Sequence, residues 1–257
     1  MNYKSTACDL SHPTVIASRP YGTSETYRHL DTTEVVDALT ECGWGFEAGT
    51  ARRTRNPDRL ASVAHVLRFS HPLMPLVRGC RVEAVIVNSH DQSTAFRLAF
   101  GVFRIACANG LIVQSCNLGS IRMRHHGLTL DRVIDATNGL IRQAPQVAGI
   151  VSDWSDIQLD AGQQQALTRR CAQARWDDAI WTGDLSAPRR DADKSDDLWT
   201  VFNRAQESVL RGGVSVTRYG PDNTTRTAKA SPVRGALRQV ALNEQLWGIA
   251  EEFATHA

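Results

Sequence analysis

The stretch VIVNSHDQSTAFRLAF, residues 85–100, most constrains the fold, because two β-prone runs flank a short polar corner. In the second run Phe96, Leu98 and Phe100 alternate with polar or small residues, so they share one face of a strand while Arg97 points from the other. The pattern predicts an antiparallel hairpin with strands over 81–88 and 93–100.

The segments before this hairpin predict a helix and two further strands. An N-cap signal at Asp31 and a glycine at Gly43 bound a helix over 32–42. Extended patterns over 44–48 and 60–69 indicate strands, and the basic sequence RRTRNPDR between them is expected to form a hairpin tip. Residues 1–28 lack periodicity and are expected to be an irregular arm.

The segments after the hairpin are mixed. Residues 102–108 suit a buried helix or a strand, and we favour a helix with Asn109-Gly110 as its C-cap, although this pair could also close a type I′ turn. Short strands are expected over 111–113 and 120–123. A helix follows from about Thr129 and is expected to stop at Pro145. Residues 29–150 thus predict a basic α+β core domain, mainly an antiparallel sheet with packed helices.

Residues 151–257 predict a helical region with few strands. Helical patterns run over 156–176, 194–211 and 240–253, and Gly212-Gly213 ends the second of them. Between the last two helices, residues 212–239 are expected to form a long basic loop, which at that length is functional or disordered.

Composition excludes several classes of protein. The 257 residues are 42% hydrophobic and 22% charged, as in globular proteins. Charged and polar residues interrupt the longest apolar run, and the N-terminus lacks a secretory signal, so we expect no membrane association and a cytoplasmic location. Six cysteines without a CxxC pair fit reduced thiols.

The charges are unevenly distributed along the chain. Residues 50–132 contain twelve arginines against four carboxylates, a net charge of +8, whereas the whole chain carries +2 and the remainder therefore −6. A basic module is thus joined to an acidic one, in which carboxylates are dense over 153–197. Codon bias explains a preference for arginine over lysine but not its clustering, and clustered guanidinium groups suit phosphate recognition.

The basic residues form a candidate nucleic-acid interface. Four would lie on the hairpin tip, four on the sheet and two in the basic loop: Arg52, Arg53, Arg55 and Arg59; Arg97, Arg104, Arg122 and Arg124; and Arg226 and Lys229. Trp44, Phe46 or Tyr219 could offer a face on which unpaired bases stack. The alternative is a solvated arginine-rich surface, which for any single arginine is the better interpretation.

The polar corner Asn88-Ser89-His90-Asp91 has two interpretations. It could bind a ligand, with Asp91 orienting the imidazole of His90. It could instead be a turn in which Asn88 or Asp91 bonds its own backbone, and we favour the turn because that is the commonest role of these residues between strands.

Motifs for covalent or metal chemistry are absent. The chain contains no HExxH, cysteine pair, Gly-x-Ser-x-Gly elbow or phosphate-loop glycines. His65, His71 and His90 could meet across two hairpins, but the sequence alone does not place them together. We therefore expect no catalytic residue, no metal and no cofactor.

Dispersed segments resemble a family of phage- and plasmid-encoded proteins, the domain of unknown function 932. The match runs nearly end to end, through VIVNSHD at 85–91, Phe103-Arg104 with Cys107 and NGL at 109–111, Ile121-Arg122, DLWT at 197–200, Gln206-Glu207, Gly212-Gly213, TRT at 225–227, and Leu246-Trp247 with IAE at 249–251 and Phe253. Members of that family carry glycine where this chain has Gln92. The resemblance implies a role on mobile elements, in work on DNA or against host defence.

These observations lead to a ranked set of functions. The first is a DNA-binding accessory protein of a mobile genetic element that binds single strands and assists annealing in recombination, and the order of elements is similar to that of the single-strand annealing proteins. The second is a counter-defence protein that binds a host protein through its acidic helical half. The third is a metal-dependent nuclease. The sequence also leaves a homo-oligomer open.

Overall fold

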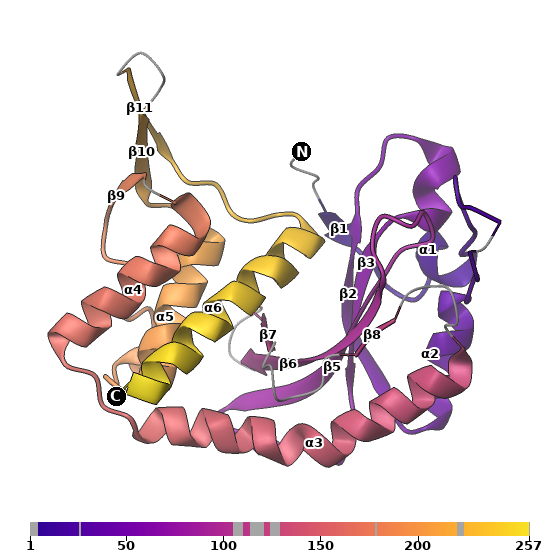
Figure 1. The fold of residues 1–257 in the computed structure, drawn as a ribbon, viewed down its shortest axis with the longest axis horizontal. Coiled ribbons are helices and arrows are strands. Elements are labelled where there is room, and N and C mark those ends of the chain that lie inside the picture. Colours follow the sequence, from indigo (N-terminus) through magenta and orange to yellow (C-terminus); the bar gives the residue numbers. More distant parts are fainter. Residues whose placement is uncertain are drawn as a thin grey trace. The chain divides into compact units, whose positions relative to one another are not determined.

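A computed structural model describes residues 5–25, 27–104, 110–113, 121–123, 129–177, 179–219 and 224–256 (Figure 1). The chain forms two compact units. Unit 1 comprises residues 1–148 and 234–240, and unit 2 comprises residues 149–233 and 241–257. Among the described helices, none has the length and apolar composition that a membrane span requires.

Unit 1 is built on an eight-stranded antiparallel sheet. Six strands follow the order β1-β2-β3-β5-β6-β7, with β4 paired to β5 and β8 paired to β6. Their bounds are β1 Ser5–Ala7, β2 Gly45–Arg52, β3 His65–Ser70, β4 Leu76–Val77, β5 Cys80–Asn88, β6 Phe96–Arg104, β7 Gly110–Val113 and β8 Ile121–Met123. The α+β class predicted from the sequence, with an antiparallel N-terminal sheet and a helical C-terminal part, is confirmed.

The predicted central hairpin is confirmed as β5 and β6, which pair in register from Cys80↔Arg104 to Val87↔Arg97. The prediction of a helix over 102–108 is wrong for residues 102–104, because strand β6 continues to Arg104. Strand β5 offers backbone partners along its whole length, so sheet pairing overrides the local helical preference. Residues 105–108 of that prediction lie outside the described residues.

The helices of unit 1 follow the sequence closely at α2 and depart from it elsewhere. Helix α2, Thr32–Glu41, matches the predicted 32–42. The arm expected over 1–28 contains strand β1 and helix α1, Pro13–Ile16. Residues 53–64, which we call the connecting segment, join β2 to β3 through a 3₁₀ helix, η1, Pro57–Ser62.

Helix α3, Leu130–Asp156, does not stop at Pro145 as the sequence predicted. Buried residues recur at three- and four-residue spacing on both sides of this proline: Val133, Ala136, Leu140, Ala144, Val147, Val151 and Trp154. Burial of this continuous apolar stripe outweighs the loss of one backbone hydrogen bond at the proline.

One face of the unit 1 sheet is covered by the start of helix α6, Ala236–His256. There Ala236 and Val240, with the partly buried Leu237, pack against a cluster of sheet side chains: Val66, Val85, Val87, Ala99 and Phe103. Since residues of one face alternate along each strand, Arg97 lies on the same face of β6 as Ala99 and Phe103.

Unit 2 contains helices α4, Ala161–Trp176, and α5, Leu198–Arg211, a short 3₁₀ helix η2, Asp191–Asp193, and most of α6. Trp154, Trp199, Phe202 and Trp247 pack together, with ring centroids 4.5–6.5 Å apart. Both α4 and α5 begin later than predicted, since Asp160 and Asp197 form their N-caps. Gly212 ends α5, as predicted, at a φ of +70°.

The basic loop expected over 212–239 contains a hairpin. Strands β10, Ser215–Tyr219, and β11, Thr225–Lys229, pair antiparallel, and β9, Ile180–Thr182, adds a third strand beside β10. The sequence did not predict these strands, because their alternating threonines and basic residues lack the apolar face by which a strand is usually recognised. Cross-strand pairing stabilises the extended conformation that the local pattern did not indicate.

Candidate nucleic-acid interface

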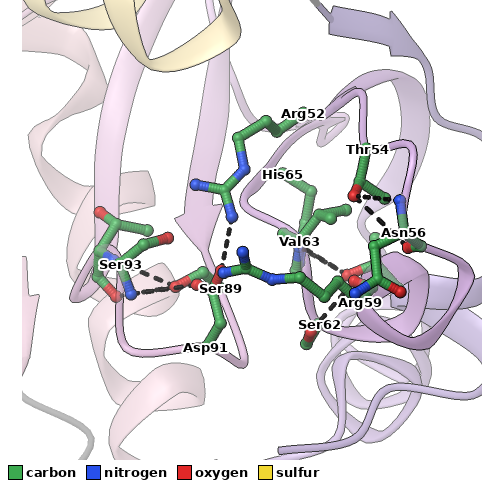
Figure 2. Close-up of polar contacts among 12 residues, drawn as sticks. Arg52, Thr54, Asn56, Arg59, Ser62, Val63, His65, Ser89, Asp91 and Ser93 are labelled. Atoms are coloured by element: carbon green, nitrogen blue, oxygen red, sulfur yellow. Dashed lines mark hydrogen bonds and ion pairs between the residues drawn. The ribbon is translucent and has the colours of Figure 1, made fainter. Parts of the chain in front are cut away.

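Asp91 lies at the centre of the candidate interface, in the turn that joins β5 to β6. Its side chain is only 2% exposed. Oδ1 accepts a hydrogen bond from the backbone N–H of Ser93 at 3.0 Å. Oδ2 accepts from the Nη2 atoms of Arg52 and, at 3.4 Å, Arg59. Figure 2 shows both guanidinium groups directed at this carboxylate. We call these three residues the Asp91 clamp.

The clamp is charged and fixed in place. Burial by itself would raise the pKa of Asp91, but hydrogen bonds from Ser93 and the charge and hydrogen bond of Arg52 outweigh it, so the net pKa of this carboxyl is lowered. Asp91 is therefore ionised at neutral pH. One carboxylate between two guanidinium groups leaves a net charge of +1 and orients both groups.

The connecting segment adds basic residues beside the clamp. Arg53 and Arg55 are exposed, and no carboxylate partner is described for either. Asp58 is also exposed on this segment, where its backbone carbonyl accepts a hydrogen bond from Arg19. The net charge of the clamp and the exposed side chains of this segment is therefore positive.

Tyr21 places an aromatic ring beside one guanidinium group of the clamp. The guanidinium carbon of Arg59 lies 5.2 Å from the centroid of the Tyr21 ring, within the range of a cation–π contact. The backbone N–H of Tyr21 donates to the carbonyl of His90 at 3.0 Å, which ties this segment to the same turn. Tyr21 remains 38% exposed.

Two of the sheet arginines lie side by side on neighbouring strands. Arg97 of β6 pairs with Arg122 of β8, and Arg122 is exposed. On its other side Arg97 pairs with Val87, and the row continues through Val66 to Thr50, two residues before Arg52 on β2. Arg52 and Arg97 therefore lie on one face of the sheet. Arg124 and the side chain of Arg104 lie outside the described residues.

Other arginines of the basic module are neutralised within the sheet. Arg68 makes a bidentate pair with Glu83 at 2.8 and 3.0 Å, and Arg81 contacts Glu47. Asp91 likewise holds Arg52 and Arg59. The count of twelve arginines against four carboxylates in the sequence therefore overstated the positive charge that is open to a ligand. Among the arginines of this module whose side chains the structure describes, the open charge is concentrated at Arg53, Arg55 and Arg122.

The remaining predicted positions, Arg226 and Lys229, lie in unit 2 on β11 and are exposed. The structure does not place them in the unit 1 interface. They belong to the β10–β11 hairpin, which is a separate basic element.

The rest of the polar corner forms a buried network. Ser89 Oγ accepts from the Thr94 N–H at 3.1 Å, and this bond closes the turn. His90 Nε2 lies 2.8 Å from Thr32 Oγ1, and the His90 ring stacks on His65 at 5.5 Å. Asn88 is 3% exposed. The contacts described for Asp91 are to Ser93, Arg52 and Arg59, so the corner combines turn contacts with the clamp.

His65 is a neutral, structural member of this buried network. His65 is fully buried, and burial lowers its pKa to about 4. Its ring nitrogens contact Thr14 and Thr32 hydroxyls at 3.3 and 3.2 Å. His71, by contrast, lies beside Trp44 and Cys42. Within the described ranges, no group of three histidine, cysteine or acidic side chains could hold a metal ion.

The carboxylates of the acidic half are largely engaged within unit 2. Asp160 and Asp197 cap helices, Asp193 and Glu207 pair with Arg190, and Asp191 pairs with Lys194. Hydrogen bonds and the charge of Arg190 outweigh burial and lower the pKa of Glu207. These contacts do not favour an acidic surface that imitates nucleic acid.

The predicted stacking residues are only partly accessible. Trp44 is 1% exposed, so it belongs to the core and cannot stack on a base. Phe46 is half-buried, and Tyr219 is 60% exposed on the unit 2 hairpin. Sequence reasoning missed Tyr21. The only available signal was an aromatic residue in a segment without apolar periodicity, because its approach to Arg59 depends on long-range packing.

Comparison with known proteins gives a family but no activity. The model of the family described as Domain of unknown function (DUF932) matches residues 22–247. The chain is 29% identical to the UPF0380 protein YafZ and 30% identical to the UPF0380 protein YfjQ, both of Escherichia coli strain K12. Each alignment covers 90% of this chain and 84% of the relative. No solved structure matches significantly.

Proposed function

We propose that this chain, which belongs to the DUF932 family, binds nucleic acid through unit 1 and favours single-stranded DNA. The observation that carries the proposal is the Asp91 clamp: a buried carboxylate orients Arg52 and Arg59 beside the exposed Arg53 and Arg55. In that role the protein would be a cytoplasmic accessory factor of a mobile genetic element that assists strand annealing.

The arrangement suits a phosphate backbone for two reasons. Oriented guanidinium groups lose less side-chain entropy on binding a phosphate, and each planar group can donate two parallel hydrogen bonds. The exposed arginines add charge that displaces condensed counterions from the nucleic acid, which makes binding favourable and dependent on salt.

Tyr21 supports the preference for single strands. A ring that is partly exposed and lies against a guanidinium group offers a stacking face to an unpaired base, whose own phosphate would then lie near the arginines of the connecting segment. In a duplex the bases are already stacked on one another, so this contact is lost.

The test is fluorescence-anisotropy titration of labelled single-stranded and duplex DNA at low salt. We expect the native chain to bind the single strand more tightly. The Arg53→Ala/Arg55→Ala double variant should weaken this binding at least tenfold, and Tyr21→Ala should weaken it by about 1 kcal/mol, the lower end for loss of one base-stacking contact.

The matched control is Arg81→Ala/Arg142→Ala. It also removes two cations from unit 1, one at the end of β5 remote from Asn88 and one on the exposed side of α3. If the control weakens binding as much as Arg53→Ala/Arg55→Ala, or if the native chain binds neither DNA, the proposed function is wrong.

A further inference from the structure

The β10–β11 hairpin of unit 2 carries cations in an unfavourable arrangement. Its register places Arg218 directly opposite Arg226. Like charges that face each other across two strands destabilise the pair. The described residues of both strands carry Arg218, Arg226 and Lys229 and no carboxylate, while Asp222 of the tip lies outside the described residues.

The arginine pair lies where the ribbon has only two strands. Strand β9 pairs with Ser215, Val216 and Thr217 and reaches no further. Strands β10 and β11 extend away from helices α4 and α5 (Figure 1). A two-stranded ribbon has little stability of its own in water. Opposed charges therefore destabilise this part of the hairpin unless a ligand neutralises them.

The two faces of the ribbon carry different groups. Val216, Arg218, Arg226 and Ala228 share one face, and Val216 is 5% exposed, so this face is anchored to unit 2 at its base. The other face carries Lys229 and a row of hydroxyl groups: Ser215, Thr217, Tyr219, Thr225 and Thr227. The Thr217 and Thr227 hydroxyls are hydrogen-bonded at 2.7 Å. All of β11 is exposed.

We propose that this hairpin inserts into a groove of duplex DNA, with the Arg218–Arg226 face and the hydroxyl face each directed to a phosphate wall. The major groove of B-form DNA, about 12 Å wide, admits a two-stranded β-ribbon. Arginine, threonine and tyrosine are common donors to phosphate oxygens. A single strand would contact one face only. The inference rests on the proposed nucleic-acid function and gives the protein a duplex contact separate from the unit 1 interface.

The test measures how the affinity of the full chain for a labelled duplex and for its separate strand depends on salt. Removing two phosphate contacts should lower the slope of log affinity against log salt by about two for duplex DNA. We expect that change for Arg218→Ala/Arg226→Ala, with single-strand affinity retained within a factor of two.

A second variant separates charge from folding. Arg218→Glu places a carboxylate opposite Arg226, so it stabilises the ribbon while it lowers the charge, and it should weaken duplex binding as much as the double alanine variant. The control Arg170→Ala/Lys194→Ala removes two exposed cations from other elements of unit 2, where they pair with Glu252 and Asp191.

The outcomes are distinct. Three results would overturn the hairpin inference. The hairpin variants could bind duplex DNA as tightly as the native chain, they could lose equal affinity for duplex and single strand, or the control could lose as much duplex affinity as they do. If single-strand binding still depends on Arg53 and Arg55, the proposed function survives that result. If the native chain binds no DNA, the proposed function fails first.

Discussion

The acidic stretch of unit 2 and the basic connecting segment of unit 1 use their charges in opposite ways. In unit 2 the carboxylates of Asp160, Asp193 and Asp197 cap helices or pair with arginine. In unit 1 the guanidinium groups of Arg53 and Arg55 are exposed without a described carboxylate partner. The comparison shows that clusters of charge in a sequence have functional meaning only after the internal ion pairs have been identified.

The largest expected effect is on a charge that is fully engaged. Glu207→Ala leaves the Arg190 guanidinium without the carboxylate that accepts two of its hydrogen bonds, at 2.9 and 3.0 Å. The free energy of unfolding, measured by urea denaturation, should fall by about 3 kcal/mol, as for other broken buried pairs. The exposed Asp191, changed to Asn, should alter it by less than about 0.5 kcal/mol. Equal effects would abolish the distinction between buried and exposed ion pairs.

A smaller effect is expected from a buried group that is kept neutral. Burial lowers the pKa of His65 from 6.5 to about 4, so the folded state disfavours its protonation. The stability contributed by neutral His65 is complete above pH 6.5 and is lost as the pH falls toward 4, by on the order of 2 kcal/mol. Urea denaturation between pH 7 and 4 should show this loss, and His65→Gln should reduce it. An unchanged pH profile in the variant would contradict this assignment.

Asp91→Asn separates pre-organisation from total charge. The variant gains one unit of positive charge, so a purely electrostatic account predicts tighter binding to single-stranded DNA. We expect weaker binding, because Arg52 and Arg59 lose the anion that orients them, together with a loss of about 1.5 kcal/mol of stability. Anisotropy titration decides between the two accounts, and tighter binding would show that the clamp is not part of the interface.

The smallest expected effect concerns the turn that carries Asp91. Gln92 has a φ of +58°, in the left-handed region that favours glycine. Gln92→Gly should raise the free energy of unfolding by about 0.5 kcal/mol, although it removes the hydrogen bond of Gln92 to Ser24. Thermal unfolding would measure the change. A destabilised variant would mean that the side-chain contact, not the backbone, holds the turn.

Local patterns predicted the fold well where they agreed with the tertiary environment. The hairpin around residues 85–100 and the helix after Asp31 could be read directly, since alternation and capping are local signals. Local patterns failed at Pro145, where a continuous buried stripe keeps the chain helical. They also failed at residues 102–104, where pairing with the long strand β5 overrides the helical preference.

The candidate site was less predictable for the same reason. The arginines of the connecting segment stood out in the sequence, and the turn at Asp91 was recognised as polar. Their meeting was not foreseeable, because Arg52 and Asp91 are 39 residues apart and come together only through the pairing of β2, β3 and β5. Tyr21 and the partners that neutralise Arg68 and Arg81 are likewise products of long-range packing.

The most direct test of the central claim is the salt dependence of single-strand binding in the native chain and in Arg53→Ala/Arg55→Ala. If these two exposed arginines each neutralise a phosphate, the slope of log affinity against log salt should decrease in magnitude by about 1.4 in the variant, with the free energy of unfolding unchanged. An identical slope in the two proteins would contradict the claim that this part of unit 1 is a nucleic-acid interface.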